Sequence, residues 1–462
     1  MGLEQDLLPL LRCPKCHGAM QFSPAATGPL AGAEFGVLRC SCARYPIIDG
    51  IPILLDSRVG MFEHTTGTAQ VSGVEPQRLV TLIEQGRGDD ALLECLAFPI
   101  LPPLVRRLLG WRLSNGPLGS SLGRWRCKRR LRADVLARRR DNSASEVFGF
   151  FYQPDSPMDI VVGDYFNLRF GQPRHLAALS LLHNVLPDDK PLLDLACGGG
   201  HLDHYLTSRY EPLKIVGTDL NFFHLWIARH WIAPTGQYVC ADAGDGLPFI
   251  DAGFSGTFCS DAYHYIPNRT ALHREMERCA PGRLGMLTRV GNAEVMPNEG
   301  MERTAAGYVE DIGAPDTRVF AESSLLKCYL NRRNPLEQPR DDPDTVGHSK
   351  WLSFAWNVPA KLRDAAALAR EWPHAAGTLR INPIYARNSV ESGLHLRFAF
   401  PSIWYAYENG GMLAYHPRRL VLERGQMEAA REGASATAVR DDLIARFVLM
   451  GMPQRFIPPQ NI

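Results

Sequence analysis

The sequence has no long apolar run, because no stretch reaches the roughly 18 to 20 residues that are needed to cross a bilayer. It begins with the acidic segment Met1–Asp6, where a secretory signal would be basic. The chain also carries almost no net charge, +1 over 462 residues, while 45% of its residues are hydrophobic. These absences predict an ordinary globular protein of about two to four domains, located in the cytoplasm and without a membrane partner.

The cysteine content does not suit a disulfide framework, since the count of 11 is odd. Cys197, Cys240 and Cys259 fall in predicted buried strands or turns, where cysteine packs as a small hydrophobic residue. The four cysteines nearest the N-terminus differ, because they form two close pairs.

A repeated pattern of strand and acid marks the middle of the chain. Over Leu192–Gly200 an apolar strand runs into an acid and a glycine-rich turn, and Leu213–Asp219 and Tyr238–Asp242 repeat the strand and the acid. Glycine lets the backbone approach a ligand at the carboxyl ends of parallel strands. The pattern therefore predicts a parallel α/β sheet whose edge presents Asp194, Asp219 and Asp242 to a cofactor. Each acid alone has an alternative interpretation as a helix N-cap.

Over roughly residues 165–292, with Leu247–Phe249 and the aromatic turn Tyr263–Tyr265, the chain resembles class I S-adenosylmethionine (SAM)-dependent methyltransferases of the ubiquinone and menaquinone biosynthesis type. The resemblance implies a Rossmann-like α/β sheet. It also implies that the glycine-rich turn wraps the methionine part of SAM, that Asp219 binds the ribose and that Asp242 binds the adenine. The implied cofactor contacts are Asp194, Ala196, Gly198, Gly200, Asp219, Leu220, Asp242, Ala243 and Ser260.

The two N-terminal cysteine pairs are Cys13 with Cys16 and Cys40 with Cys42, and four thiolates can close a tetrahedral zinc site. With Tyr45–Leu55, this segment resembles the zinc-ribbon family that includes the activator subunit of tRNA and protein methyltransferases. The resemblance implies bound Zn²⁺ and a ribbon that covers apolar surface of a methyltransferase, here in cis. The alternatives are a metal-free ribbon, His17 as a substitute ligand, and a ribbon that handles substrate or dimerises.

Basic residues are concentrated between the ribbon and the strand-acid pattern. Such a segment can attract the phosphates of RNA or of a nucleotide, whereas the simpler interpretation is that its arginines are solvated or pair with acids elsewhere. The residues concerned, interleaved with Trp111 and Trp125, are Arg106, Arg107, Arg112, Arg124, Arg126, Lys128, Arg129, Arg130, Arg132, Arg138, Arg139 and Arg140.

Candidate catalytic residues follow the fourth strand of the predicted methyltransferase sheet. His264 titrates near neutral pH and can act as a general base, Asp261 can orient the acceptor or bind its own loop, and Tyr265 flanks the histidine. The turn lacks the Asn/Asp-Pro-Pro-Tyr signature of methyltransferases acting on planar nitrogens. A small-molecule acceptor is favoured; the alternatives are RNA and non-methyl chemistry on SAM. The sequence specifies neither the acceptor nor the oligomeric state.

The expected organisation is a zinc ribbon over residues 1–60, a helical basic connector over 61–145, a SAM-binding core over 146–295 and a substrate-binding region over 296–462. In this last region, Thr378–Tyr385 and Leu394–Pro401 alternate apolar and polar residues, which predicts a hairpin. We expect this hairpin to supply the closing strands of the methyltransferase sheet, with residues 296–375 inserted over the active site. A helix is expected over Ala436–Met450.

Overall fold

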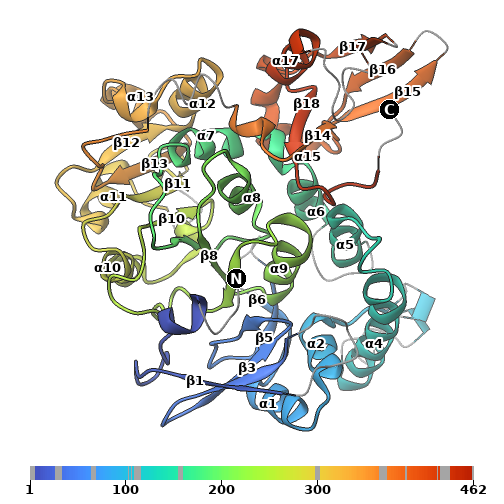
Figure 1. The fold of residues 1–462 in the computed structure, drawn as a ribbon. Helices are drawn as coiled ribbons and strands as arrows, with labels where there is room; N and C mark the ends of the chain where they lie inside the picture. The colour runs from blue at the N-terminus through green and yellow to red at the C-terminus, as the bar shows by residue number, and fades with distance from the viewer. Residues whose placement is uncertain are drawn as a thin grey trace.

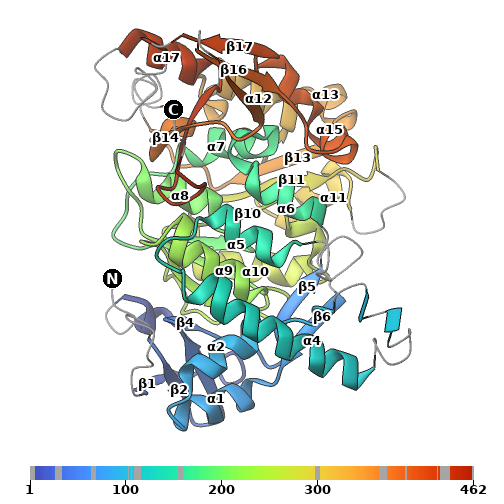
Figure 2. The same cartoon turned by 90° about the vertical axis from the view of Figure 1, so that its right-hand side faces the viewer.

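The structure is a computed structural model that describes residues 6–25, 34–63, 69–101, 104–105, 107–108, 116–153, 160–296, 302–363, 372–390, 393–423, 425–426 and 437–459. A central sheet lies between the N-terminal segments at one end and residues 372–459 at the other (Figures 1 and 2). Within the described residues, no helix combines the length and the apolar character needed to span a bilayer.

The central sheet has seven strands in the order β12-β13-β11-β10-β7-β8-β9. Strands β7 to β11 run parallel, and β13 is antiparallel to both of its neighbours. The chain order reverses between β7 and β10, and ligands of open α/β sheets bind at such a point. The predicted α/β class is confirmed by these strands: β7 (Leu192–Leu195), β8 (Ile215–Asp219), β9 (Gln237–Cys240), β10 (Gly256–Ser260), β11 (Gly285–Gly291), β12 (Arg318–Ala321) and β13 (Trp351–Trp356).

Helices cover both faces of this sheet. Successive residues of a strand point to opposite sides, and the apolar side chains on each side are buried against helices. Leu192 and Phe258 pack on one face, against α7 (Pro173–Leu182), α8 (His201–Ser208), α9 (Phe222–Ile227) and α12 (Glu322–Leu330). Leu193 and Cys259 pack on the other face, against α10 (Arg269–Cys279) and α11 (Ala305–Ile312). The short α13 (Pro343–Gly347) precedes β13.

The expectation for the closing strands was wrong. They are β12 and β13, which lie inside the region expected to be an insertion. The alternating segments instead build a separate sheet of β15 (Tyr385–Val390), β16 (Gly393–Phe398) and β17 (Arg419–Leu422), in which β15 and β16 form the hairpin. The reason is burial. Both faces of β13 are covered, so its sequence is an almost continuous apolar run, whereas a strand with one solvent-exposed face alternates apolar and polar residues.

The rest of the C-terminal region also departs from expectation. Thr378–Tyr385 is divided, since β14 (Thr378–Ile381) pairs with β18 (Leu449–Met452) and Tyr385 begins β15. The helix expected to reach Met450 ends earlier, as α17 (Thr437–Ala445). The helix α15 (Ile403–Asn409) connects β16 to a short turn before β17.

The N-terminal segment folds as an antiparallel sheet of β1 (Gln21–Pro24), β2 (Gly36–Arg39), β3 (Arg44–Ile48) and β4 (Ile51–Pro52). The connector, expected to be helical, begins with a hairpin of β5 (Val59–Glu63) and β6 (Ala69–Val74). Its helices are α1 (Pro76–Glu84), α2 (Gly88–Leu96) and α4 (Pro117–Arg130), and they are followed by α5 (Ala144–Phe151) and α6 (Ile160–Asn167).

Backbone hydrogen bonds join the ribbon to the central sheet. The Leu54 amide donates to the Cys240 carbonyl at 2.8 Å, next to a parallel bridge between Ile53 and Cys240. The Arg12 amide donates to the Pro248 carbonyl at 2.8 Å. The ribbon thus continues the sheet beyond β9.

A buried carboxylate reinforces this junction. Oδ2 of Asp49, on the turn before β4, accepts from Trp226 Nε1 at 2.8 Å and pairs with Arg139 at 3.2 Å. It also lies 2.7 Å from His230 Nε2. Burial raises the pKa of Asp49, but the interactions with His230, Trp226 and Arg139 lower it by more. The pKa of Asp49 is therefore below its usual value. The charge is therefore retained inside the junction.

Candidate active site and metal centre

The glycine-rich turn after β7 has the conformation that its glycines predict. Gly198 and Gly200 have φ of 55° and 73°, in the left-handed region that favours glycine. Ala196 has φ of 56°, although alanine carries a Cβ that disfavours this conformation. The turn is held against β8 because the Gly198 amide donates to Asp219 Oδ2 at 2.9 Å. Strain of this kind is concentrated at ligand sites.

Asp194 and Asp203 form a buried pair of carboxyl groups behind this turn. Oδ1 of Asp194 and both carboxyl oxygens of Asp203 have no hydrogen-bond partner among the described residues. Burial raises the pKa of Asp203 to about 7, and burial together with Asp203 raises the pKa of Asp194. Among the described residues neither carboxyl group has an ion-pair partner, so the pair retains a proton near neutral pH. The sequence analysis missed Asp203; its only signal was an acid one turn into a helix that follows a glycine loop.

The other predicted cofactor residues lie along the same edge of the sheet. Asp219 is buried and its Oδ1 accepts from the Asn221 amide at 2.7 Å, so it caps the next turn as well. Asp242 is half-buried, accepts from the Gly244 amide at 2.8 Å and has a pKa raised by burial. Ser260 Oγ accepts from Thr288 at 2.8 Å. Leu220 and Ala243 are half-buried beside these acids. The N-cap alternative does not hold for Asp219, because the N-cap of α9 is Asn221.

Aromatic rings from α5 and α6 cover the glycine-rich turn. Phe166 stacks on Phe148 with ring centroids 5.1 Å apart, and His201 Nε2 lies 3.0 Å from the Phe166 carbonyl. A Cβ built on Gly199 would lie 2.9 Å from the Phe148 ring. Glycine at this position is therefore required by the close approach of the ring.

On the other half of the edge, Asp261 follows β10 and binds three arginines. Its Oδ2 lies 3.2 Å from Arg169 and 3.1 Å from Arg174, and its Oδ1 lies 3.0 Å from Arg289 Nε. The Tyr165 hydroxyl donates to Oδ2 at 2.9 Å. Burial opposes ionisation, but the arginines outweigh it and hold the pKa of Asp261 far below its usual value. Asp261 is therefore a permanent anion that has no affinity for a proton near neutral pH.

Carboxylates and a lysine extend this cluster toward α15. Arg289 also pairs with Glu322 at 2.9 Å and with Glu408 at 3.0 Å. Glu408 in addition pairs with Arg174 at 3.3 Å and with Lys350 at 3.4 Å. The Arg289 guanidinium lies 3.9 Å from the centroid of the Trp351 ring. The sequence analysis did not find these residues, because they come from segments far apart in the chain.

His264 lies beside this cluster and is 2% exposed. Burial lowers its pKa to about 4, so its imidazole is neutral at pH 7, and Nδ1 has no partner among the described residues. The Tyr265 ring lies 4.1 Å from the imidazole, centroid to centroid, and burial raises the pKa of this tyrosine, so its hydroxyl keeps its proton. The three predicted catalytic residues thus lie together, with different protonation states.

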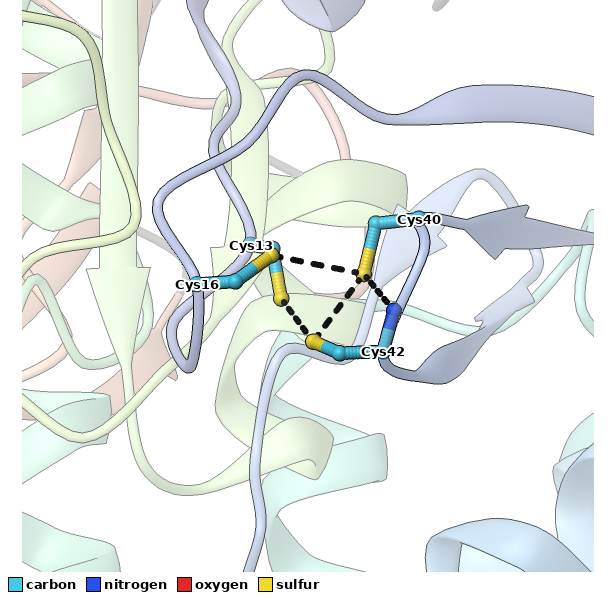
Figure 3. Close-up of side chains that lie close together, drawn as sticks. All are labelled: Cys13, Cys16, Cys40 and Cys42. Atoms are coloured by element: carbon cyan, nitrogen blue, oxygen red, sulfur yellow. Dashed lines mark hydrogen bonds between the residues drawn. The ribbon is translucent and has the colours of Figure 1, made fainter.

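The four N-terminal cysteines converge in the ribbon (Figure 3). The sulfur atoms of Cys13 and Cys42 are 3.6 Å apart, those of Cys40 and Cys42 are 3.4 Å apart and those of Cys16 and Cys40 are 3.9 Å apart. Four thiolates about 2.3 Å from a tetrahedral zinc ion lie about 3.8 Å from one another. The cluster therefore fits zinc, and His17 is not part of it.

Half of the predicted basic residues of the connector that the structure describes are paired with acids. Glu94 binds Arg124 at 2.9 Å and Lys128 at 2.8 Å, and Asp90 binds Arg132 at 2.9 Å. Arg130 pairs with Asp134 and Arg139 with Asp49. The interpretation that these arginines pair with acids is confirmed for these positions. Arg106, Trp111 and Arg112 lie outside the described residues.

The sheet order and the site agree with the comparison to known families. Residues 192–281 match the model of the family described as "Methyltransferase domain". The chain therefore contains a class I SAM-dependent methyltransferase domain, as the resemblance of Asp194, Asp219 and Asp242 implied, and it is an enzyme of that class.

A second match concerns another part of the chain. Over 66 residues, 14% of this chain and 97% of the relative, the sequence is 30% identical to a UPF0434 protein of Shewanella amazonensis. Through that segment the chain belongs to the UPF0434 family.

Solved structures resemble the chain only in part. A complex of the Haloferax volcanii Trm112 methyltransferase activator with a candidate methyltransferase is 16% identical, has a TM-score of 0.32 and is matched over 43% of this chain and 94% of that chain. A TehB-like SAM-dependent methyltransferase of Corynebacterium glutamicum is 13% identical, has a TM-score of 0.27 and is matched over 40% of this chain and 86% of that chain. Neither likeness bears on what this chain methylates.

Proposed function

We propose that the protein transfers the methyl group of SAM to a small-molecule acceptor, and that its zinc ribbon stabilises the catalytic domain in cis. The observation that favours a small acceptor is the burial of the side chains around Asp261, at one half of the sheet edge. His264 is 2% exposed, and the side chains of Asp261 and Arg289 are 10% and 4% exposed. Side chains so enclosed suit a small acceptor, whereas a folded RNA or protein needs an open surface.

The cofactor half of the edge fits SAM. The orphaned Oδ1 of Asp194 and the left-handed backbone of the glycine turn offer an acceptor and a close approach to the methionine part. In this assignment Asp219 and Leu220 hold the ribose, Asp242 and Ala243 hold the adenine, and Ser260 borders the methyl group. The negative charge available at Asp194 and Asp203 complements a cationic ligand.

SAM supplies, when bound, a methyl group that its sulfonium has already activated. The protein then has to align the acceptor and, for an acidic acceptor, remove a proton. In this proposal, neutral His264 takes that proton on Nδ1, and the Tyr265 hydroxyl donates a hydrogen bond to the acceptor. Asp261 does not act as the base, because its pKa is far below its usual value and it does not take up a proton. It positions Arg174 and Arg289 instead.

The alternative of an RNA acceptor loses support in the connector, where pairs with Glu94, Asp90, Asp134 and Asp49 neutralise many of the arginines. A paired arginine has less charge to offer a phosphate. Non-methyl chemistry on SAM would use the same cofactor contacts, so product analysis has to separate it.

Support for the ribbon's role in cis is its attachment to the catalytic sheet. The backbone hydrogen bond from Leu54 to Cys240 joins the ribbon to β9, and the hydrogen bond from Trp226 to the buried Asp49 joins it to α9. Leu38 and Ile47 of the ribbon pack in the same core as Val239 of the sheet. Zinc at the four cysteines would supply folding energy that so small a domain lacks.

The first test is to incubate the protein with methyl-labelled SAM and a host-cell extract and to separate RNA, protein and small molecules. We expect label in the small-molecule fraction, and less of it at limiting SAM when Asp219→Ala replaces the native chain. Label in RNA would contradict the proposed acceptor. Products that carry no methyl label while SAM is consumed would contradict methyl transfer itself.

The ribbon is tested by Cys13→Ser with Cys16→Ser, because two of four ligands are then lost. We expect zinc to fall below stoichiometry and soluble yield to drop, with catalysis per folded molecule little changed. Zinc content is measured by mass spectrometry and yield by sedimentation, with Cys95→Ser as a control outside the cluster. Unchanged zinc and yield would refute the role of the ribbon.

A further inference from the structure

The structure leaves an apolar and basic helix face uncovered on the connector. On α4, Leu118 is 63% exposed, Leu122 is 42% exposed and Trp125 is 60% exposed, and Leu104 and Leu108 are exposed just before this helix. At spacings of four and three residues, Leu118, Leu122 and Trp125 lie on one face of the helix. Arg126 and Arg129 are exposed beside them and have no ion-pair partner among the described residues.

The opposite face of α4 is fixed to the protein, so the outward direction of this apolar face is not accidental. Gly119, Gly123 and Cys127 are buried. A Cβ on Gly123 would lie 3.0 Å from the Ile100 amide nitrogen, which means that the helix packs directly on backbone. Arg124 donates to the Ala97 carbonyl at 2.8 Å and pairs with Glu94. Figure 2 shows α4 on the side that faces the viewer, at the end of the molecule where the ribbon lies.

We propose that the α4 face made by Leu118, Leu122, Trp125, Arg126 and Arg129 docks on the surface of a membrane that contains anionic lipids. Leucine and tryptophan side chains enter the boundary between headgroups and acyl chains, and arginines at that depth bind lipid phosphates. From Cys95 to Ala133 the sequence has no acidic residue, so the charge of this segment complements an anionic surface.

The chemistry of the face favours lipid over RNA. Arginine and tryptophan serve both ligands, but exposed leucines gain nothing from a phosphate backbone, and the aliphatic residues here outnumber the single exposed ring of α4. An interfacial helix needs no membrane-spanning segment, so this proposal replaces the expectation that the protein has no membrane partner. It stands independently of the proposed methyl transfer.

The test is flotation of the full-length protein with vesicles of phosphatidylcholine, alone or mixed with phosphatidylglycerol. We expect binding to the mixed vesicles, weakened by salt and by Arg126→Gln and Arg129→Gln by about fivefold each. Leu118→Asp with Leu122→Asp should lower binding by about tenfold or more. No binding to the mixed vesicles, or binding only to added RNA, would overturn the proposal.

Matched control variants come from the other exposed apolar residues. Trp404, on α15, is 59% exposed and Leu413 is 41% exposed. These exposed fractions nearly equal those of Trp125 and Leu122. Trp125→Ala should weaken vesicle binding while Trp404→Ala does not, and Leu122→Asp should act while Leu413→Asp does not. Equal losses in both pairs would refute α4 as the docking face. Thermal melting checks that every variant is folded, and SAM binding should be unchanged in all of them.

Discussion

The two halves of the sheet edge treat their buried aspartates in opposite ways. Asp194 and Asp203 have no ion-pair partner in the part of the chain that the structure describes, and their pKa values are raised. Asp261 lies among Arg169, Arg174 and Arg289, and its pKa is lowered. Burial is comparable on both sides, so the cations decide the direction of the shift.

This difference suits the different ligands that we propose for the two halves. The half at Asp194 can take a positive charge, which suits the proposed place of the methionine part of SAM. The half at Asp261 already balances its charges, with Arg289 bound to three carboxylates, Asp261, Glu322 and Glu408.

The largest effect should come from breaking the charged half with Asp261→Ala. The buried guanidinium group of Arg169 would lose its carboxylate partner, and Arg174 and Arg289 would each lose one of theirs, so the free energy of unfolding should fall by about 3–5 kcal/mol. Urea denaturation measures this change. Asp251→Ala, at a surface acid whose side chain is 82% exposed, serves as the control and should have little effect. A loss no greater than that of the control would show that the cluster does not stabilise the fold.

Next in size is His264→Gln, which removes the proposed base but keeps a side chain of similar polarity. Loss of general-base catalysis costs about 10²–10⁴ in rate. Because the pKa of His264 is about 4, the native rate should fall only as the pH drops toward 4, when the imidazole becomes charged. The variant should lose this acid-side dependence, while exposed His348→Gln keeps it. A native profile in His264→Gln would contradict the assignment.

The half of the edge at Asp194 is probed by Asp203→Asn. Between the ordinary pKa of 3.8 and the folded value of about 7, the unfolded chain is ionised while the folded protein holds a proton. The native chain should therefore lose stability relative to the variant as pH rises through this window, on the order of 1.4 kcal/mol for each pH unit. Denaturation at a series of pH values measures this difference. Exposed Asp245→Asn should show no such trend; a constant difference for Asp203→Asn would refute the raised pKa.

The smallest effect is expected for Asp219→Ala, which removes a proposed contact to the ribose of the cofactor. Losing a charged acceptor for the ribose should weaken SAM binding by about tenfold. Calorimetry at constant pH measures the affinity. Since Asp219 also holds the Gly198 amide, folding is checked by melting. Unchanged affinity would show that the ribose lies elsewhere.

The predicted cofactor acids could be placed from the sequence because each lies at or near the carboxyl end of its own buried strand, and strand and acid are adjacent in the chain. Asp194, Asp219 and Asp242 lie at the predicted edge for this reason. The four cysteines were likewise recognisable from two short spacings. Local patterns of this kind survive folding because parallel strands align their carboxyl ends.

The rest depended on contacts between distant segments. Arg174 and Glu408 are 234 positions apart yet pair at 3.3 Å. The closing strand β13 was missed because strands buried on both faces do not alternate, while the peripheral β15 and β16 do. Asp203 was missed because an acid on a helix is normally solvent-facing.

The attachment of the ribbon at Leu54 and Cys240 also changes the outline of the sheet. A parallel sheet that ended at β9 would offer a row of unpaired amides and carbonyls, which is a template for pairing with another chain. Part of that row is occupied by the segment after β4. A catalytic domain cut free of its first 60 residues would thus begin with an open strand edge, and we expect it to self-associate through β9 rather than merely to lose stability.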